Sequence, residues 1–170
     1  MPHINGIPPL HRLLQNTGSS TDLWTQTKTL LGFSNASYQH IHMPAKVYPT
    51  LAPDAEVTTS ATANTLGDAV QLIPADEIAT PFDIHWLNIS DMSANGTYEI
   101  VLYIAADAGL TDLTEIGRVR VTRTANITSS DNTFIQVPVI PASSRIATKA
   151  ACTESGAKTV KFSVHYHGYE

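Results

Sequence analysis

Residues 159–167 read TVKFSVHYH, and this stretch decides the predicted fold. Apolar and polar residues alternate along it, which is the period of a β-strand with one buried face. The side chains expected in the core are Val160, Phe162, Val164 and Tyr166. The intervening residues, His165 and His167 among them, would then point outward together.

The paired histidines allow two interpretations. His165 and His167 could hold a metal ion jointly, but two ligands are too few for a tight site. A third would come from another strand or another chain, and three copies of the pair around a three-fold axis would offer six nitrogens. The other interpretation is a polar outer face or a subunit contact. We expect the latter, with no bound metal and no cofactor. The same spacing recurs at His40 and His42.

The end of the same stretch partly matches one enzymatic motif. HYHGYE, residues 165–170, resembles the H-x-H and following Glu that bind metal in cupins, but Glu170 is one residue too close and ends the sequence. Elsewhere Ser, His and Asp occur without a G-x-S-x-G nucleophile elbow. We therefore expect no catalytic residues and no enzymatic activity.

Composition excludes several classes of partner. The chain has 170 residues, enough for one domain plus an appendage. Charged residues make up 15%, below the roughly 25% typical of soluble domains, and the net charge is −5. Without a dense Lys/Arg cluster or a long apolar run, we expect neither nucleic-acid binding nor membrane insertion. Cys152 is the only cysteine, so no intrachain disulfide forms, and we expect a buried, inert thiol.

The chain divides by composition and hydrophobic pattern into residues 1–53 and residues 54–170. The first part is interrupted by prolines and has no sustained period, which predicts an extended N-terminal arm. One short helix is expected within it, from Thr21 or Asp22 to Gly32. Because an arm lacks its own core, its apolar residues should contact the β-domain or another subunit. The expected contact residues are Leu13, Leu14, Trp24, Leu30, Phe33 and Tyr38.

Residues 54–170 contain short strand-like runs separated by turn signals such as Asn95-Gly96. Their spacing predicts an antiparallel β-sandwich, jelly-roll-like, of about eight strands. Pro138 marks its run as an edge strand or a bulge, because proline cannot donate to the ladder. The expected strands are residues 56–62, 69–73, 82–89, 97–105, 116–124, 133–140, 144–152 and 159–167.

Two charged groups were considered as binding sites. The carboxylates at Asp107, Asp112 and Glu115 lack the D-x-D-x-D-G calcium pattern, so a solvated loop is expected. The arginines of the run GRVRVTR are expected in salt bridges or at an interface. These arginines are Arg118, Arg120 and Arg123.

Residues 133–169 resemble the C-terminal portion of small β-sandwich virion proteins of tailed bacteriophages. The likeness lies in a strand ending in I-P-A, then S-R-I-A-x-K, a Ser/Gly turn, and a terminal strand closing on H-Y-H. It implies a virion location and a structural subunit, such as a head decoration or cement protein that binds the major capsid protein or other virion subunits. Such proteins are commonly homotrimers.

Two alternatives stay open beside this one. A receptor- or sugar-binding module of a tail or fibre would present exposed aromatic residues over a shallow groove. The candidates are Trp86 and Tyr103, which lie in predicted strands and are expected in the core or at an interface. A metal-dependent β-sandwich enzyme is the third possibility.

Overall fold

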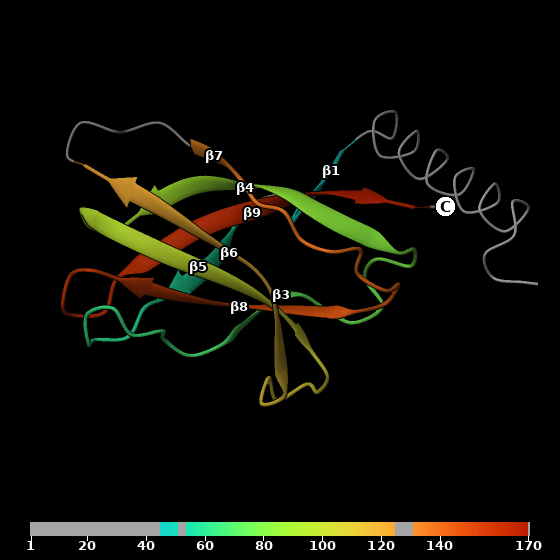
Figure 1. The fold of residues 1–170 in the computed structure, drawn as a ribbon, viewed down its shortest axis with the longest axis horizontal. Coiled ribbons are helices and arrows are strands. Elements are labelled where there is room, and N and C mark those ends of the chain that lie inside the picture. Colours follow the sequence, from blue (N-terminus) through green and yellow to red (C-terminus); the bar gives the residue numbers. More distant parts are fainter. Residues whose placement is uncertain (1–44, 51–53, 125–130, 170) are drawn as a thin grey trace, which may run out of the picture. The chain divides into compact units, whose positions relative to one another are not determined.

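The computed structural model describes residues 45–50, 54–124 and 131–169, which form nine β-strands in two antiparallel sheets (Figure 1). Among these residues there is no helix, and hence none long and apolar enough to cross a membrane. The strands are β1 (Lys46–Tyr48), β2 (Ala55–Thr58), β3 (Val70–Ile73), β4 (Phe82–Met92), β5 (Gly96–Ala105), β6 (Leu113–Arg123), β7 (Asp131–Phe134), β8 (Arg145–Cys152) and β9 (Thr159–Gly168).

The strand order is that of a jelly roll. One sheet, called here the β9 sheet, runs β1-β9-β4-β7, with β2 also paired to β9; the other, the β5 sheet, runs β3-β8-β5-β6. From β2 onward the strands form two four-stranded layers joined by crossings between sheets, as in two Greek keys. The expected all-β antiparallel sandwich is therefore confirmed.

The terminal strand β9 is the centre of its sheet. It pairs with β1, β2 and β4, and Val160, Phe162 and Val164 are fully buried against the other sheet. Tyr166 packs on the same core with partial exposure. The alternation in the sequence thus identified the buried face correctly.

The core lies between the two sheets and takes side chains from both. Phe82, Ile84 and Leu87 enter it from β4, and Tyr98 and Ile100 enter it from β5, all of them fully buried. Cys152 is 2% exposed and belongs to the same cluster, which confirms the expected buried thiol.

The run 133–140 departs from its prediction as one strand. The ladder of β7 ends at Phe134, and only Ile140 pairs again, through a bridge to Phe82. Ile135, Val137 and Ile140 are nevertheless buried, and both ends of the segment bond to β4, through Ile135 to His85 and through Ile140 to Phe82. Because nothing pairs with it at Pro138, the missing N–H costs nothing there.

The chain divides into two compact units, residues 1–43 and 44–170, and all nine strands lie in the second. Strand β1 falls in the stretch that the sequence assigned to the arm, and it pairs with β9 through Lys46, Val47 and Tyr48. The expected helix in residues 21–32 lies outside the described residues.

The Tyr98 side chain is hydrogen-bonded to the turn that connects β4 and β5. Its hydroxyl donates to the Ala94 carbonyl at 3.0 Å and accepts from the Ala94 N–H at 3.2 Å. Burial raises the pKa of this phenol. Gly96 in the same corner has φ +139°, which L side chains rarely adopt.

We expect Tyr98→Phe to lower the free energy of unfolding by about 1–2 kcal/mol, because two hydrogen bonds are lost in a part-buried site. Urea denaturation at pH 7 measures this. Because the pKa of Tyr98 is raised in the folded protein, there is a pH range above 10.0 in which the unfolded chain has lost the phenolic proton and the folded protein still holds it. The wild type should therefore lose stability as the pH rises through 10.0, the ordinary pKa, and its advantage over Tyr98→Phe should narrow. An advantage that grows above this pH would contradict the assignment.

Candidate functional site

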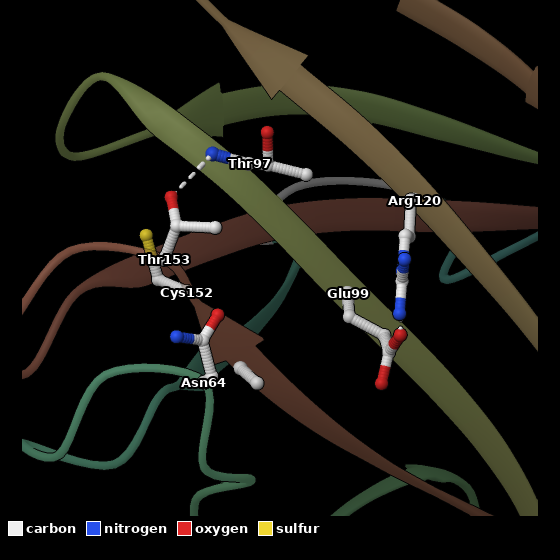
Figure 2. Close-up of a pocket in the computed structure, with 7 residues that line it drawn as sticks. Asn64, Thr97, Glu99, Arg120, Cys152 and Thr153 are labelled. Atoms are coloured by element: carbon white, nitrogen blue, oxygen red, sulfur yellow. Dashed lines mark hydrogen bonds and ion pairs between the residues drawn. The ribbon is translucent and has the colours of Figure 1, made fainter.

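The arginines of β6 are paired with carboxylates of β4, β5 and β6. Arg118 and Arg120 both contact Glu99, with Arg120 Nε 2.7 Å from its carboxylate, and Arg123 lies 3.8 Å from Asp91. This confirms the expected salt bridges. Glu99 and Arg120 line a shallow pocket beside Cys152 (Figure 2), so the charges there are already compensated.

The acidic loop after β5 is organised by one carboxylate. Asp107 accepts hydrogen bonds from the N–H groups of Asp112 and Thr111 and from the Thr111 hydroxyl, at 2.9–3.0 Å, and these bonds lower its pKa. Glu115 pairs instead with Arg118. The carboxylates do not converge, in agreement with a solvated loop.

Strand β4 carries two bulges that keep one face apolar. Its buried apolar residues are Phe82, Ile84, Leu87, Ile89 and Met92, so their spacing alternates between two and three residues. The pairing of β4 with β9 shifts between Ile84 and Trp86 and again after Ile89, where the spacing is three. A bulge adds one residue to a strand and can re-aim a side chain. At the first bulge the β4–β9 register passes from Ile84 to Trp86, and the carbonyl of the extra residue, His85, accepts a hydrogen bond from the Ile135 N–H at 2.8 Å.

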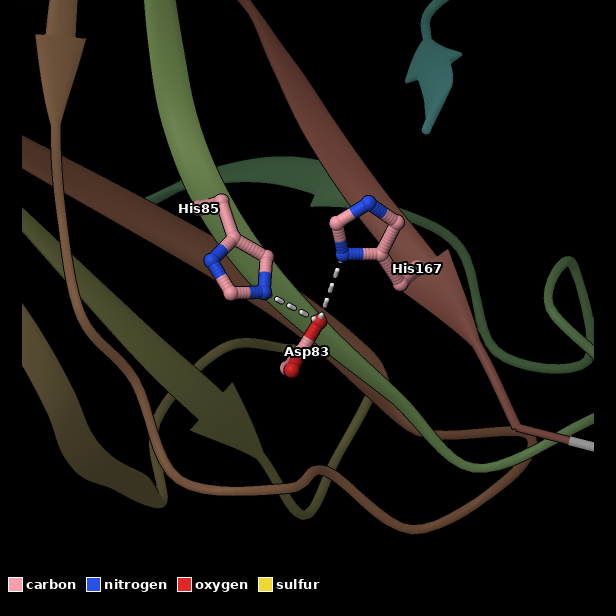
Figure 3. A group of neighbouring side chains, drawn as sticks. All are labelled: Asp83, His85 and His167. Carbon is pink, nitrogen blue, oxygen red and sulfur yellow. Dashed lines mark ion pairs between the residues drawn. The ribbon is translucent and has the colours of Figure 1, made fainter. Parts of the chain in front are cut away.

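The first bulge and the β4–β9 pairing bring Asp83, His85 and His167 together (Figure 3). Asp83 lies directly opposite His167 in the ladder. His85 Nε2 is 2.8 Å and His167 Nδ1 is 3.7 Å from Asp83 Oδ1, and the two imidazole centroids are 4.7 Å apart. The three side chains are only 8–13% exposed. The cluster is thus a compact group of two imidazoles and one carboxylate.

Tyr169 completes the cluster from the residue that follows β9. Its hydroxyl donates a hydrogen bond to Asp83 Oδ2, the carboxylate oxygen that does not face the imidazoles. Burial and the hydrogen bond to Asp83 raise the pKa of Tyr169. This hydrogen bond to Oδ2 fixes the orientation of the carboxylate and therefore the position of Oδ1, which faces the imidazoles.

The prediction that both terminal imidazoles point to the exterior is wrong for His167, which is 8% exposed. It does share a face with His165, but its neighbours from β4 enclose it in the cluster. His165 is not part of that group and contacts Trp86 edge-on, with 6.4 Å between ring centroids. The two histidines therefore have different surroundings.

A row of side chains crosses the β9 sheet on its outer face. Phe134 of β7, Trp86 of β4, His165 of β9 and Val47 of β1 are successive ladder partners, so their side chains lie on one side. Trp86 is 38% and Phe134 is 59% exposed. We call these four residues the aromatic row. Trp86 was expected in the core or at an interface, and the core is excluded, because the bulge places the side chain on the outer face.

The aromatic row borders a shallow depression lined by Trp86, Asn132 and His165. The neighbouring ladder pair, Asn88 opposite Asn132, is uncharged. The contact residues expected in the arm lie outside the described residues, as do His40 and His42. Those contact residues are Leu13, Leu14, Trp24, Leu30, Phe33 and Tyr38.

The fold and these groups define an all-β jelly-roll protein with a buried two-histidine, one-carboxylate cluster beside an exposed aromatic row. No protein-family model and no curated protein matches the chain.

Solved structures of infectious bursal disease virus proteins are among those similar to this chain. They include infectious bursal disease virus Gx strain, with 17% identity, a TM-score of 0.35, and coverage of 74% of this chain and 32% of that one. The VP2 subviral particle of infectious bursal disease virus has 16% identity, a TM-score of 0.37, and coverage of 73% and 33%. This chain spans about a third of the length of those chains.

Proposed function

We propose that the chain is a non-enzymatic structural protein of a virus particle, which binds and stabilises the capsid surface as a decoration or cement subunit. The aromatic row is the observation that carries this proposal. Exposed Trp and Phe side chains on a sheet face are typical anchors of protein interfaces, where aromatic residues are enriched and charged residues are depleted. The arm, residues 1–53, is proposed to add a second set of contacts.

Several features of the chain favour a protein partner on this face. Trp86 and Phe134 lie side by side on neighbouring strands, and the polar residues next to them are amides. One ion pair on this face, Glu56 with Lys161, lies at another part of β9. An uncharged surface with two aromatic anchors fits a protein surface repeated by symmetry, where many modest contacts act together. The resemblance of residues 133–169 to phage virion proteins points the same way, and a homotrimer is part of the proposal.

We expect Trp86→Ser combined with Phe134→Ser to leave the domain folded and to weaken attachment to capsids at least about 30-fold, the effect of losing one interface hot spot. Binding is measured by co-sedimentation of the purified chain with capsids that lack it. Val139→Ser is the matched control, since Val139 is 60% exposed and lies outside the strands. Unchanged attachment of the double variant would contradict a role for the aromatic row.

Deletion of residues 1–40 tests the arm separately. The compact unit 44–170 stays intact in this variant, and we expect it to remain soluble but no longer to attach to particles. Retained attachment would show that the anchor lies elsewhere. Antibody-labelled electron cryomicroscopy of native particles should place the chain at regular positions on the head.

The second candidate is a receptor- or sugar-binding module of a phage tail or fibre. The depression lined by Trp86, Asn132 and His165 favours it, because an aromatic face flanked by an amide and an imidazole is able to bind a sugar ring. This candidate places the chain at a tail tip and predicts glycan binding that Trp86→Ser abolishes.

A further inference from the structure

We propose that Asp83, His85 and His167 form a binding site for a divalent transition-metal ion within a single subunit, with Zn²⁺ as the best-fitting ion. This site differs from the pair His165 and His167 suggested by sequence spacing, and it does not depend on the proposed function. Two imidazoles and one carboxylate are a common donor set for Zn²⁺ in proteins that leave a fourth position open.

The distances in the cluster suit such an ion. Metal–ligand bonds of about 2.0–2.1 Å in tetrahedral geometry place neighbouring ligand atoms about 3.3 Å apart. The two imidazole nitrogens lie 2.8 and 3.7 Å from Asp83 Oδ1, and one ligand atom from each of the three residues lies within 4.8 Å of the others. Side-chain rotations that move the ligand atoms by up to about 1.5 Å relative to one another would therefore bring all three to bonding distance.

The ligands are held by strands rather than by a loop. Asp83 and His85 lie on β4, and the ladder places His167 on β9 opposite Asp83. The bulge after Ile84 is what turns His85 toward this pair. Burial of all three side chains limits competition from water, and the Tyr169 hydroxyl fixes Asp83 Oδ2. The site is thus positioned in advance by the fold.

A metal at this place would join the start of β4 to the end of β9. Because the ion binds only the folded arrangement, it should stabilise the native state by mass action. At a free concentration of 100 times Kd, the melting temperature should rise by roughly 5–10 °C.

The test uses the full chain without an affinity tag, stripped with a chelator and titrated with Zn²⁺ by calorimetry. We expect one ion per chain. His85→Gln and His167→Gln should each weaken binding at least about 100-fold, and Tyr169→Phe, which removes only the hydrogen bond to Asp83 Oδ2, roughly 10-fold. His165→Gln is the matched control, because it alters the same face of β9 two residues away and should leave affinity and the thermal shift unchanged. Substitution by Co²⁺ should give the absorption of a tetrahedral site.

Three results would overturn the proposal. The first is a wild type without saturable one-to-one binding. The second is binding that persists unchanged in folded His85→Gln and His167→Gln, which would assign it to other histidines. The third is an equal loss in His165→Gln, which would place the ligands in the terminal pair instead. If the His→Gln variants do not fold, Tyr169→Phe decides, since unaltered affinity there would contradict a carboxylate ligand positioned by Tyr169.

Discussion

Phe162→Ala is expected to lower the free energy of unfolding by about 3–5 kcal/mol, the largest effect of any single truncation considered. Phe162 is fully buried on β9, the strand that pairs with β1, β2 and β4. Its removal leaves a cavity at the centre of the β9 sheet, where the surrounding strands are held by their ladders and cannot collapse into the space. For a chain of this size the melting temperature should fall by roughly 10 °C.

Lys161→Ala is the matched control for this change. Lys161 is the preceding residue on the same strand, with its side chain 41% exposed and paired with Glu56 at 3.0 Å. Loss of one exposed ion pair should cost less than about 1 kcal/mol. Urea denaturation of both variants measures the free energy of unfolding and so distinguishes the buried face of β9 from its exposed face. Similar losses of stability in the two variants would mean that the register of β9 is assigned incorrectly.

The second large effect is expected from Gly67→Ala, which should cost about 3 kcal/mol or more. A Cβ at this position would lie 2.2 Å from the Thr58 carbonyl oxygen and 2.9 Å from the Thr59 carbonyl carbon. The Gly67 N–H donates to the Ala150 carbonyl at 2.9 Å, which holds the backbone in place on the other side. Both neighbours are backbone atoms, so no side-chain rotation relieves the contact and the backbone itself must move. The cost is therefore expected at or above the upper end of the usual 1–3 kcal/mol for overpacking.

Gly156→Ala provides the comparison for Gly67→Ala. Gly156 has φ +78°, but a Cβ there meets only the end of Lys158 at 3.4 Å. The cost should be the left-handed backbone penalty alone, about 1–2 kcal/mol. Denaturation midpoints measured on the two variants should keep this order. A Gly67→Ala protein as stable as wild type would show that the segment before β3 does not approach β2 so closely.

Much of the fold could be predicted from local pattern. The period-2 alternation of residues 159–167 and 97–105 gave the buried faces of β9 and β5, because side chains on successive residues of a strand point to opposite faces. Turn residues such as Asn95 and Gly96 marked where strands end. The prediction of one strand over residues 133–140 was wrong, since alternating apolar residues indicate burial but not a continuous ladder with a neighbouring strand.

The candidate metal site was missed for an identifiable reason. The sequence pattern suggests His165 and His167 as a pair of ligands, because they are two residues apart in the chain. The actual partners of His167 lie more than eighty positions earlier, on β4. One signal was present in FDIHWLNISDM, residues 82–92, where the apolar spacing of three residues predicts a bulge.

The amino-acid sequence alone determined the fold class, the approximate strands and the apolar face of the terminal strand, because these depend on interactions between residues near one another in the chain. The tertiary structure alone decided which imidazole is enclosed, which carboxylate accompanies it, and that Trp86 faces outward. Those outcomes depend on the β4–β9 register and on one extra residue in β4, and the free energy that selects a register comes from the packing of both sheets together.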